Sequence, residues 1–165
     1  MPMKKNKKTN KRLLLISSTG GHFSELKQLF PLVTNYDYWI VTERDKTTEK
    51  LKEQYQERIH YLFYGTREHP VSYIIKLIGN CFRSLFYYIR FRPKIIITTG
   101  AHTAGPMCCI GKLFGSKIIF IETYANATTK TITGRIIYHF ADEFIVQWES
   151  MIKLYPKAKY YGGVY

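Results

Sequence analysis

The sequence contains little cysteine, and the few residues present are poorly placed for disulfides or for a metal. The three cysteines are Cys81, Cys108 and Cys109. Three cysteines do not form a disulfide framework, and an adjacent pair without further Cys or His at metal-ligand spacing does not form a zinc site. We therefore expect a reducing, cytosolic setting and no bound metal.

Long uninterrupted apolar runs are also missing. A membrane-spanning helix needs roughly 20 consecutive apolar residues, and the best candidate, residues 71–91, is broken by Lys76 and Arg83. Residues 1–12 carry six Lys or Arg side chains, but the apolar run that follows is shorter than the roughly 7–15 residues of a signal-peptide core. We predict that residues 1–11 form a basic disordered tail. Such a tail can be simply solvated, and it can also be attracted to anionic lipid by about 1 kcal/mol per basic residue; the two are compatible.

Signatures of nucleotide binding are absent as well. The dinucleotide fingerprint G-x-G-x-x-G does not occur, which disfavours nicotinamide and flavin cofactors. The stretch from Gly105 to Leu113 fails as a P-loop, because five residues rather than four separate Gly105 from Gly111 and Leu113 stands where Ser or Thr is required. We therefore expect no cofactor and no ATP hydrolysis.

Acidic residues are scarce. Twelve Asp and Glu oppose 25 Lys and Arg, which leaves a formal net charge of +13. A charge of this size implies anionic partners, namely nucleic acid, an acidic membrane surface or phosphorylated ligands. The basic residues are split between the tail and one helix, and no RRM, KH or helix-turn-helix signature is present. We therefore expect no nucleic-acid partner and keep a basic nucleic-acid-binding α/β protein as the alternative.

What the sequence does contain is a regular alternation of β-prone and helix-compatible segments. With 165 residues, 45% of them apolar, the chain can bury one core. The β-prone runs are residues 13–16, 38–41, 59–63, 94–98, 117–121 and 143–146. Short buried strands separated by helices predict a single Rossmann-like α/β domain over residues 12–165, with a parallel sheet and helices on both faces.

The first loop of this domain, Ser17 to Gly21, joins a strand to a helix. Its two glycines allow close approach of a ligand, and the first turn of the following helix attracts anions. His22 stands at the mouth of the loop, and Glu25 is a possible capping-box partner. The alternative is that any α/β domain needs a tight first turn, so that the glycines and the histidine serve geometry alone.

Two further loops follow predicted strands. The loop after Thr98 carries Gly100 and His102, and the carboxyl end of a strand is where open α/β sheets bind ligands. A single histidine there is more often a polar loop residue, but two histidine-bearing loops at two strand ends favour a site. The third loop begins with Glu122 and contains Asn126, which suits hydroxyl recognition. Capping of the next helix explains Thr128 and Thr129 equally well.

Residues 71–91 predict one long helix of unusual composition. Lys76, Arg83 and Arg90 recur every seven residues and form a narrow polar stripe, whereas the remaining arc, which includes Phe82 and Phe86, is apolar or aromatic. We expect this helix to lie in a membrane interface, with the apolar arc in the acyl boundary and the basic stripe toward headgroups. The alternative is a helix packed on the sheet whose basic side chains reach outward.

Several of these stretches together resemble a known protein family. They are Gly20-Gly21-His22, Thr99 to His102 with Gly105-Pro106, Glu122, and the closing run Ala141 to Trp148 with Tyr155-Pro156 and Tyr161 to Gly163. The family is that of the membrane-anchoring subunit of the dolichol-pathway N-acetylglucosaminyltransferase, with bacterial relatives in exopolysaccharide and capsule biosynthesis. The resemblance covers nearly the whole chain from Arg12 onward. Its most specific element is Phe-Ile-Val-Gln-Trp, because the glycine-rich loops also occur in other GT-B glycosyltransferases such as the lipid II-forming enzyme.

The resemblance implies half an enzyme. In single-chain GT-B enzymes, an acceptor-binding N-terminal domain precedes a domain that binds the nucleotide sugar, and the active site lies between them. This chain resembles the N-terminal domain only. We therefore expect a separate, catalytic donor-binding subunit that holds a UDP-sugar, and a polyprenyl-diphosphate-linked saccharide as acceptor. The implied location is peripheral, at the cytoplasmic face of the cell membrane. A self-sufficient small Rossmann enzyme is the remaining alternative and would need its own cofactor site.

The expected site follows from this reaction. An acceptor hydroxyl must lose its proton as it attacks the anomeric carbon, and His22 is the expected base, with His102 as the alternative. The expected acceptor-binding residues are Thr19, Gly20, Gly21, Thr99, Gly100, His102, Gly105, Glu122 and Asn126.

The end of the chain is the expected partner interface. Aromatic residues and glycines from Tyr160 onward are a poor choice for a solvated tail and are favoured where two proteins meet. The alternative is that they form the last strand of the domain's own sheet. The expected interface residues are Gln147, Trp148, Tyr161, Gly162, Gly163, Val164 and Tyr165.

Overall fold

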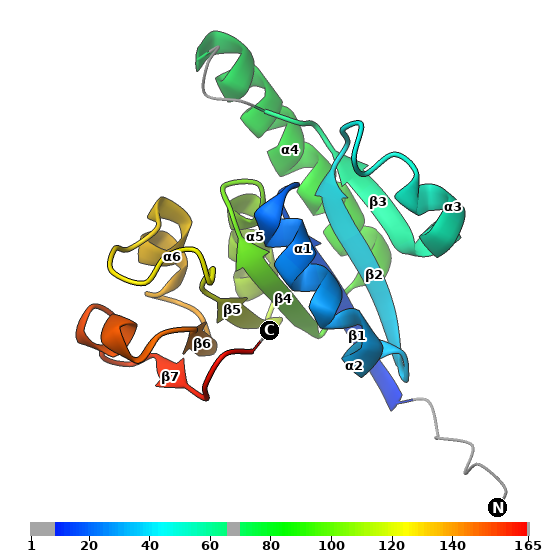
Figure 1. Ribbon diagram of the computed structural model, residues 1–165. Coiled ribbons are helices and arrows are strands. Elements are labelled where there is room, and N and C mark those ends of the chain that lie inside the picture. Colours follow the sequence, from blue (N-terminus) through cyan, green and yellow to red (C-terminus); the bar gives the residue numbers. More distant parts are fainter. Residues whose placement is uncertain (1–8, 66–69, 165) are drawn as a thin grey trace, which may run out of the picture.

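Seven parallel strands form a single sheet in the computed structural model, which describes residues 9–65 and 70–164. The strands are β1 (Thr9–Ser17), β2 (Tyr36–Glu43), β3 (Ile59–Leu62), β4 (Ile95–Gly100), β5 (Lys117–Ile121), β6 (Glu143–Val146) and β7 (Lys159–Tyr160). Their order is β3-β2-β1-β4-β5-β6-β7, and every neighbouring pair is parallel (Figure 1). The predicted Rossmann-like fold is therefore confirmed.

The predicted N-terminal tail overlaps the sheet. Residues 1–8 lie outside the described part of the chain, and β1 begins at Thr9, which pairs with Tyr36 of β2. The boundary expected at residue 12 is therefore late by three residues, because the polar start of β1 extends the strand beyond its apolar core.

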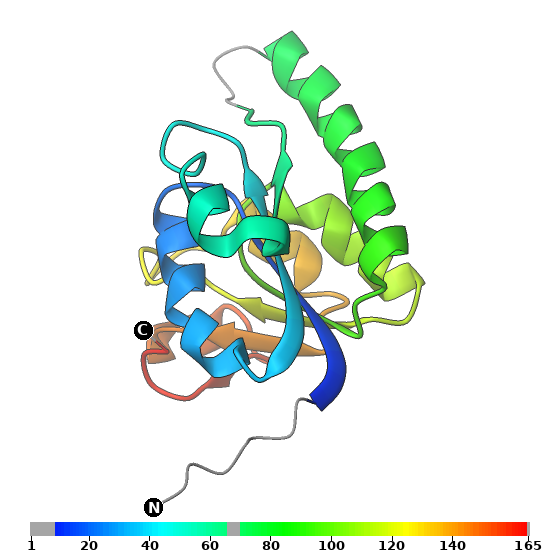
Figure 2. The ribbon, with the colours of Figure 1, turned by 90° about the vertical axis from the view of Figure 1, so that its right-hand side faces the viewer.

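Helices cover both faces of the sheet (Figures 1 and 2). On one face lie α1 (Gly21–Gln28), α2 (Phe30–Val33) and α3 (Leu51–Tyr55), and on the other lie α4 (Pro70–Phe91), α5 (Ala104–Leu113) and α6 (Ile132–Ile137). Short 3-10 helices occupy Gln56–Arg58 and Glu149–Lys153. Alternate residues of β1 supply the two cores: Leu13 and Leu15 pack with α1, and Leu14 and Ile16 pack on the opposite face. A central strand buried on both faces explains why its sequence is continuously apolar.

The polar stripe of α4 faces the protein, which corrects the predicted orientation of Arg83 toward lipid headgroups. Arg83 Nη1 donates to the carbonyl of Tyr61 at 3.1 Å, and its guanidinium lies 3.8 Å from the ring centroid of Phe63. Asn80 exchanges two hydrogen bonds with the backbone of Phe63, and the Tyr87 hydroxyl also donates to Tyr61. The physical reason is that β3 is the edge strand, whose outward backbone groups need partners.

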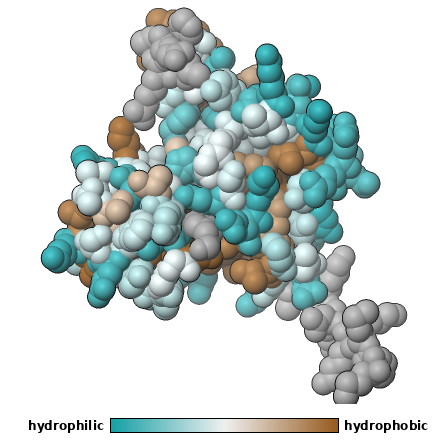
Figure 3. Space-filling model, viewed as in Figure 1, coloured by the Kyte–Doolittle hydropathy of each residue, from teal (hydrophilic) through white to brown (hydrophobic). Residues whose placement is uncertain are grey.

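The apolar arc of α4 is exposed instead. Seven of its side chains are between 53% and 73% exposed, namely Val71, Ile74, Ile75, Ile78, Phe82, Phe86 and Ile89. On the polar stripe, Lys76 is half-buried and Arg90 is exposed. Viewed as in Figure 1, the rest of the surface is mostly hydrophilic with scattered hydrophobic patches (Figure 3). Among the described helices, none combines the length and the apolar character that crossing a bilayer requires.

The C-terminal segment is tied to the domain. Strand β7 pairs with β6, and beyond it the backbone N–H of Val164 donates to Gln147 Oε1 at 2.8 Å. Gln147 is only 2% exposed, so its expected place in a partner interface is wrong: its carboxamide holds this chain's own C-terminal segment. Tyr161 is 68% exposed and Trp148 is half-buried, whereas Tyr165 lies outside the described residues.

Candidate functional site

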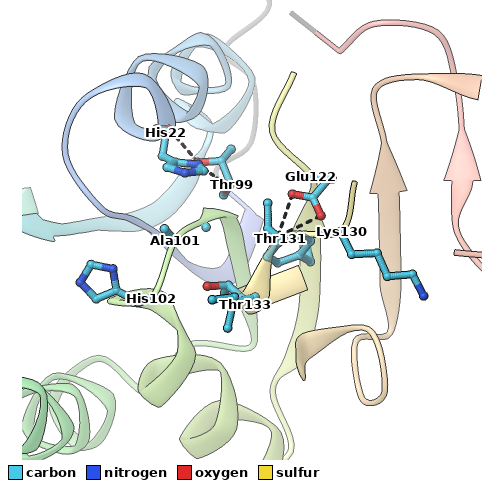
Figure 4. Close-up of a pocket in the computed structure, with 11 residues that line it drawn as sticks. His22, Thr99, Ala101, His102, Glu122, Lys130, Thr131 and Thr133 are labelled. Carbon is cyan, nitrogen blue, oxygen red and sulfur yellow. Dashed lines mark hydrogen bonds between the residues drawn. The ribbon is translucent and has the colours of Figure 1, made fainter. Parts of the chain in front are cut away.

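The candidate site lies where the strand order reverses. Strands β1 and β4 are neighbours, but the chain leaves β1 toward α1 on one face and β4 toward α5 on the other. Loops that diverge in this way open a crevice at the carboxyl ends of the strands. A pocket of about 320 Å³ lies there. It is lined by His22, Thr99, Gly100, Ala101, His102, Phe120, Glu122, Lys130, Thr131, Ile132 and Thr133 (Figure 4).

His22 is held in a defined tautomer. Its Nδ1 lies 2.7 Å from the carbonyl oxygen of Thr99. A carbonyl only accepts, so the neutral imidazole carries its proton on Nδ1 and its lone pair on Nε2. The Thr99 hydroxyl donates back to the His22 carbonyl at 2.7 Å, which fixes the two loops together. Gly100 has φ of +93°, and a Cβ there would lie 3.4 Å from His22 Cε1, so this position favours glycine.

His102 is paired with a buried carboxylate. Its Nε2 lies 3.5 Å from Glu43 Oε1, and Glu43 is 2% exposed at the end of β2. The Thr103 hydroxyl donates to the same oxygen at 2.5 Å, and the Thr19 backbone N–H lies 3.4 Å from Oε2. Glu43 was not among the predicted site residues. The signal that points to it is an acidic residue just after the predicted strand 38–41, since carboxyl ends of parallel strands share one edge.

Glu122 forms the opposite wall of the pocket, across from the two histidines (Figure 4). It is 1% exposed and accepts hydrogen bonds from the hydroxyls of Thr131 and Tyr155 and from the backbone of Thr123. Burial raises the pKa of the Glu122 carboxyl, while these hydrogen bonds oppose the shift. Thr131 is also the N-cap of α6, because its side chain accepts from the N–H of Gly134 at 2.9 Å. Neither Thr128 nor Thr129 has this role.

Gly134 packs directly against Glu122, Thr131 and Tyr155, so that no larger side chain fits at this position. A Cβ at Gly134 would lie 2.6 Å from Thr131 Oγ1 and 2.7 Å from the Tyr155 hydroxyl, and it would also collide with Glu122. Overpacking costs about 1–3 kcal/mol, and a broken buried hydrogen bond adds about 1–3 kcal/mol. We therefore expect Gly134→Ala to lower the free energy of unfolding by about 2–6 kcal/mol in denaturant titrations. Gly105→Ala is the matched control, because nothing lies within 4 Å of its Cβ position. Equal stability of the two variants would contradict this account.

Other predicted site residues lie outside this pocket. Gly20 is exposed on the first loop, Gly21 is exposed at the start of α1, and Gly105 lines a separate groove. Asn126 accepts a hydrogen bond from the Thr129 hydroxyl and does not line the pocket. Glu25 is no capping-box partner: Gly20 is the N-cap without a side-chain bond, and Glu25 Oε1 accepts from Thr123 and Tyr124 of the third loop.

The reactive groups of the pocket are side chains of the chain itself. Within residues 9–65 and 70–164, no group of three or more His, Cys, Asp or Glu side chains is arranged to hold a metal ion. Lys130 is the cationic side chain of the lining, and it extends away from the histidines, with its Nζ 5.0 Å from the Tyr155 ring centroid (Figure 4). The groups that line the pocket are thus a histidine whose Nδ1 is bound to Thr99, a histidine beside the Glu43 carboxylate, the Glu122 carboxyl and threonine hydroxyls.

Solved structures share this fold. Acinetobacter baumannii MurG matches with a TM-score of 0.67 and 18% identity over 85% of this chain. The UDP-N-acetylglucosamine 2-epimerase from Rickettsia bellii matches with a TM-score of 0.71 and 10% identity over 94% of this chain. The chain spans only 42% and 45% of these two proteins, and at such identities the likeness shows the fold alone.

Sequence comparisons identify the family. The "UDP-N-acetylglucosamine transferase subunit ALG14" of Mus musculus is 25% identical over 179 residues, which cover 93% of this chain and 82% of that protein. The protein of the same name from Candida albicans is 29% identical over 171 residues, covering 92% and 77%. Residues 13–164 match the family described as "Oligosaccharide biosynthesis protein Alg14 like". With a match over nearly the whole domain and a sheet of the expected topology, this chain belongs to the Alg14-like family of oligosaccharide biosynthesis proteins.

Proposed function

We propose that this chain is the acceptor-binding subunit of a two-chain glycosyltransferase. A separate catalytic subunit holds a UDP-sugar, and the complex transfers the sugar to a saccharide on polyprenyl diphosphate. Family membership and relatives named as transferase subunits support the subunit role. The observation that carries the acceptor role is the pocket at the switch point, where His22 lies across from a wall built from the Glu122 carboxyl and threonine hydroxyls.

The chemistry of this chain is a proton transfer. The acceptor hydroxyl attacks the anomeric carbon as the bond to UDP breaks, and its proton passes to His22 Nε2. The resulting imidazolium keeps its Nδ1 hydrogen bond to Thr99. Glu25 Oε2 lies 4.0 Å from the same nitrogen and has no hydrogen-bond partner among the described residues. This carboxylate therefore stabilises the positive charge that develops on the ring.

The setting belongs to the same proposal. We place the complex at the cytoplasmic face of the cell membrane, in capsule or exopolysaccharide biosynthesis, with this chain bound peripherally. The exposed apolar arc of α4 supports membrane attachment. The saccharide context rests on the sequence resemblance alone. Tyr161, Gly162, Gly163 and Trp148 are the proposed contacts with the catalytic subunit, because Tyr161 is exposed beyond the edge strand β7.

The proposal predicts that activity requires both chains. We expect the purified chain to show no transfer from any UDP-sugar of a panel, and to show transfer when its donor-binding partner is added. The physical reason is that one Rossmann-like domain supplies only one wall of an interdomain cleft. Transfer is measured as radiolabelled sugar on an extracted lipid acceptor, with the partner alone as control. Robust turnover by this chain alone would refute the two-chain reading.

A further inference from the structure

A second hollow lies on the face of the sheet covered by α4, α5 and α6. It is a groove of about 460 Å³ between these three helices. Its lining is mainly apolar and consists of Tyr73, Leu77, Cys81, His102, Gly105, Pro106, Cys109, Ile132, Thr133, Ile136 and Ile137. Figure 2 shows α4 on the outside of this layer, alongside α5.

The inner end of the groove meets the candidate site. His102, Ile132 and Thr133 line both the groove and the pocket that contains His22. A ligand in the groove therefore lies directly next to the pocket that contains the proposed reaction centre. His102 stands at this junction with Glu43 behind it.

The outer end of the groove meets the apolar arc of α4. Cys81 lines the groove and is exposed next to Phe82, which is 70% exposed. On the other rim, Ile136 of α6 is 56% exposed. These apolar side chains face solvent on two helices. Covering them with a hydrocarbon chain lowers the free energy, because it removes apolar surface from water.

We propose that this groove binds the hydrocarbon chain of the lipid-linked acceptor, in the part adjacent to its diphosphate. The proposal rests on the proposed function and extends it from the saccharide to the lipid. The order of features along the groove matches such a molecule: a surface suited to lipid, an apolar channel, a polar junction and then the pocket with the base. A peptide is the poorer occupant, because its backbone needs hydrogen-bond partners and the polar groups of this lining are few.

Two thiols allow a direct test on the chain itself. Cys81 and Cys109 line the groove, whereas Cys108 is fully buried. Partial burial raises the pKa of the Cys109 thiol, and the neighbouring Cys81 adds to the shift, so alkylation is best followed in mildly alkaline buffer. In a Cys81→Ser variant, we expect geranylgeranyl diphosphate at about ten times its Kd to slow maleimide labelling of Cys109 about tenfold. Inorganic diphosphate at the same concentration should leave the rate unchanged. No protection by the lipid, or equal protection by inorganic diphosphate, would overturn the proposal.

Filling the groove tests its role in the complex. We expect Cys109→Trp to lower kcat/KM about tenfold or more for a long polyprenyl acceptor, and to leave kcat/KM unchanged for an acceptor with a short alkyl chain. Leu113→Trp, at an 83% exposed position of the same helix α5 outside the groove, is the matched control. Equal losses for both acceptors, or no loss for either, would overturn the proposal. If the unmodified complex does not glycosylate a polyprenyl acceptor, the proposed function fails, while the labelling assay still decides whether the groove binds lipid.

Discussion

Replacing His22 with alanine lowers kcat of the assembled complex by about 10²–10⁴-fold, the usual contribution of a general base. The expectation rests on geometry: Nδ1–H is committed to the Thr99 carbonyl, which leaves Nε2 as the atom that takes the proton. His22→Asn preserves a polar side chain but removes the basic nitrogen, so it should lose as much. Steady-state kinetics with saturating donor and acceptor measure the effect, and His139→Ala, at an exposed histidine, is the control.

The two His22 variants together separate a base from a structural histidine, because His22→Asn keeps a polar side chain without a basic nitrogen. Near-normal turnover of both His22 variants would mean that the ring only ties Thr99 in place. The same substitutions then belong at His102, where the buried Glu43 carboxylate provides a countercharge for a protonated ring.

The double substitution Phe82→Glu with Phe86→Glu is expected to weaken binding to anionic liposomes by about 10²–10⁴-fold. Both rings are exposed, at 70% and 57%, so their removal from the apolar arc should not unfold the domain. Burying a Phe side chain contributes about 1.5–3 kcal/mol, so the pair accounts for about 3–6 kcal/mol of membrane affinity. Liposome flotation measures the effect, with thermal unfolding as the test of folding.

The matched control is Leu32→Glu, because Leu32 is 71% exposed on α2, on the opposite face of the sheet. Unchanged flotation of the double variant would show that the arc of α4 contacts something other than lipid. Arg83→Glu does not test the membrane contact. Because Arg83 donates to Tyr61 and stacks on Phe63, its reversal should destabilise the docking of α4 before it affects any lipid contact.

The fold could be predicted because its signals are local and periodic. Leu13 to Ile16 read as a strand buried on both faces, and such strands occur in parallel sheets covered by helices. Parallel strands end at a common edge, so loops that follow successive strands meet in space. This rule alone was enough to bring His22, Thr99, His102 and Glu122 toward one pocket. Turn residues such as Gly100 were also recognisable, because a glycine directly after a β-prone run is a local signal for the end of a strand.

The sequence by itself therefore determined the architecture, the edge on which the candidate site lies and the amphipathic character of residues 70–91. Only the tertiary structure decided which atoms meet, because those contacts join residues far apart in the chain. His22 acquires its tautomer from Thr99, and His102 acquires its carboxylate from Glu43. Periodicity defines two faces of a helix but not which one packs inward. For α4 the edge strand β3 and the residue after it decided the orientation. The carbonyl of Tyr61 accepts from Arg83 and the backbone of Phe63 binds Asn80, which leaves the apolar arc exposed.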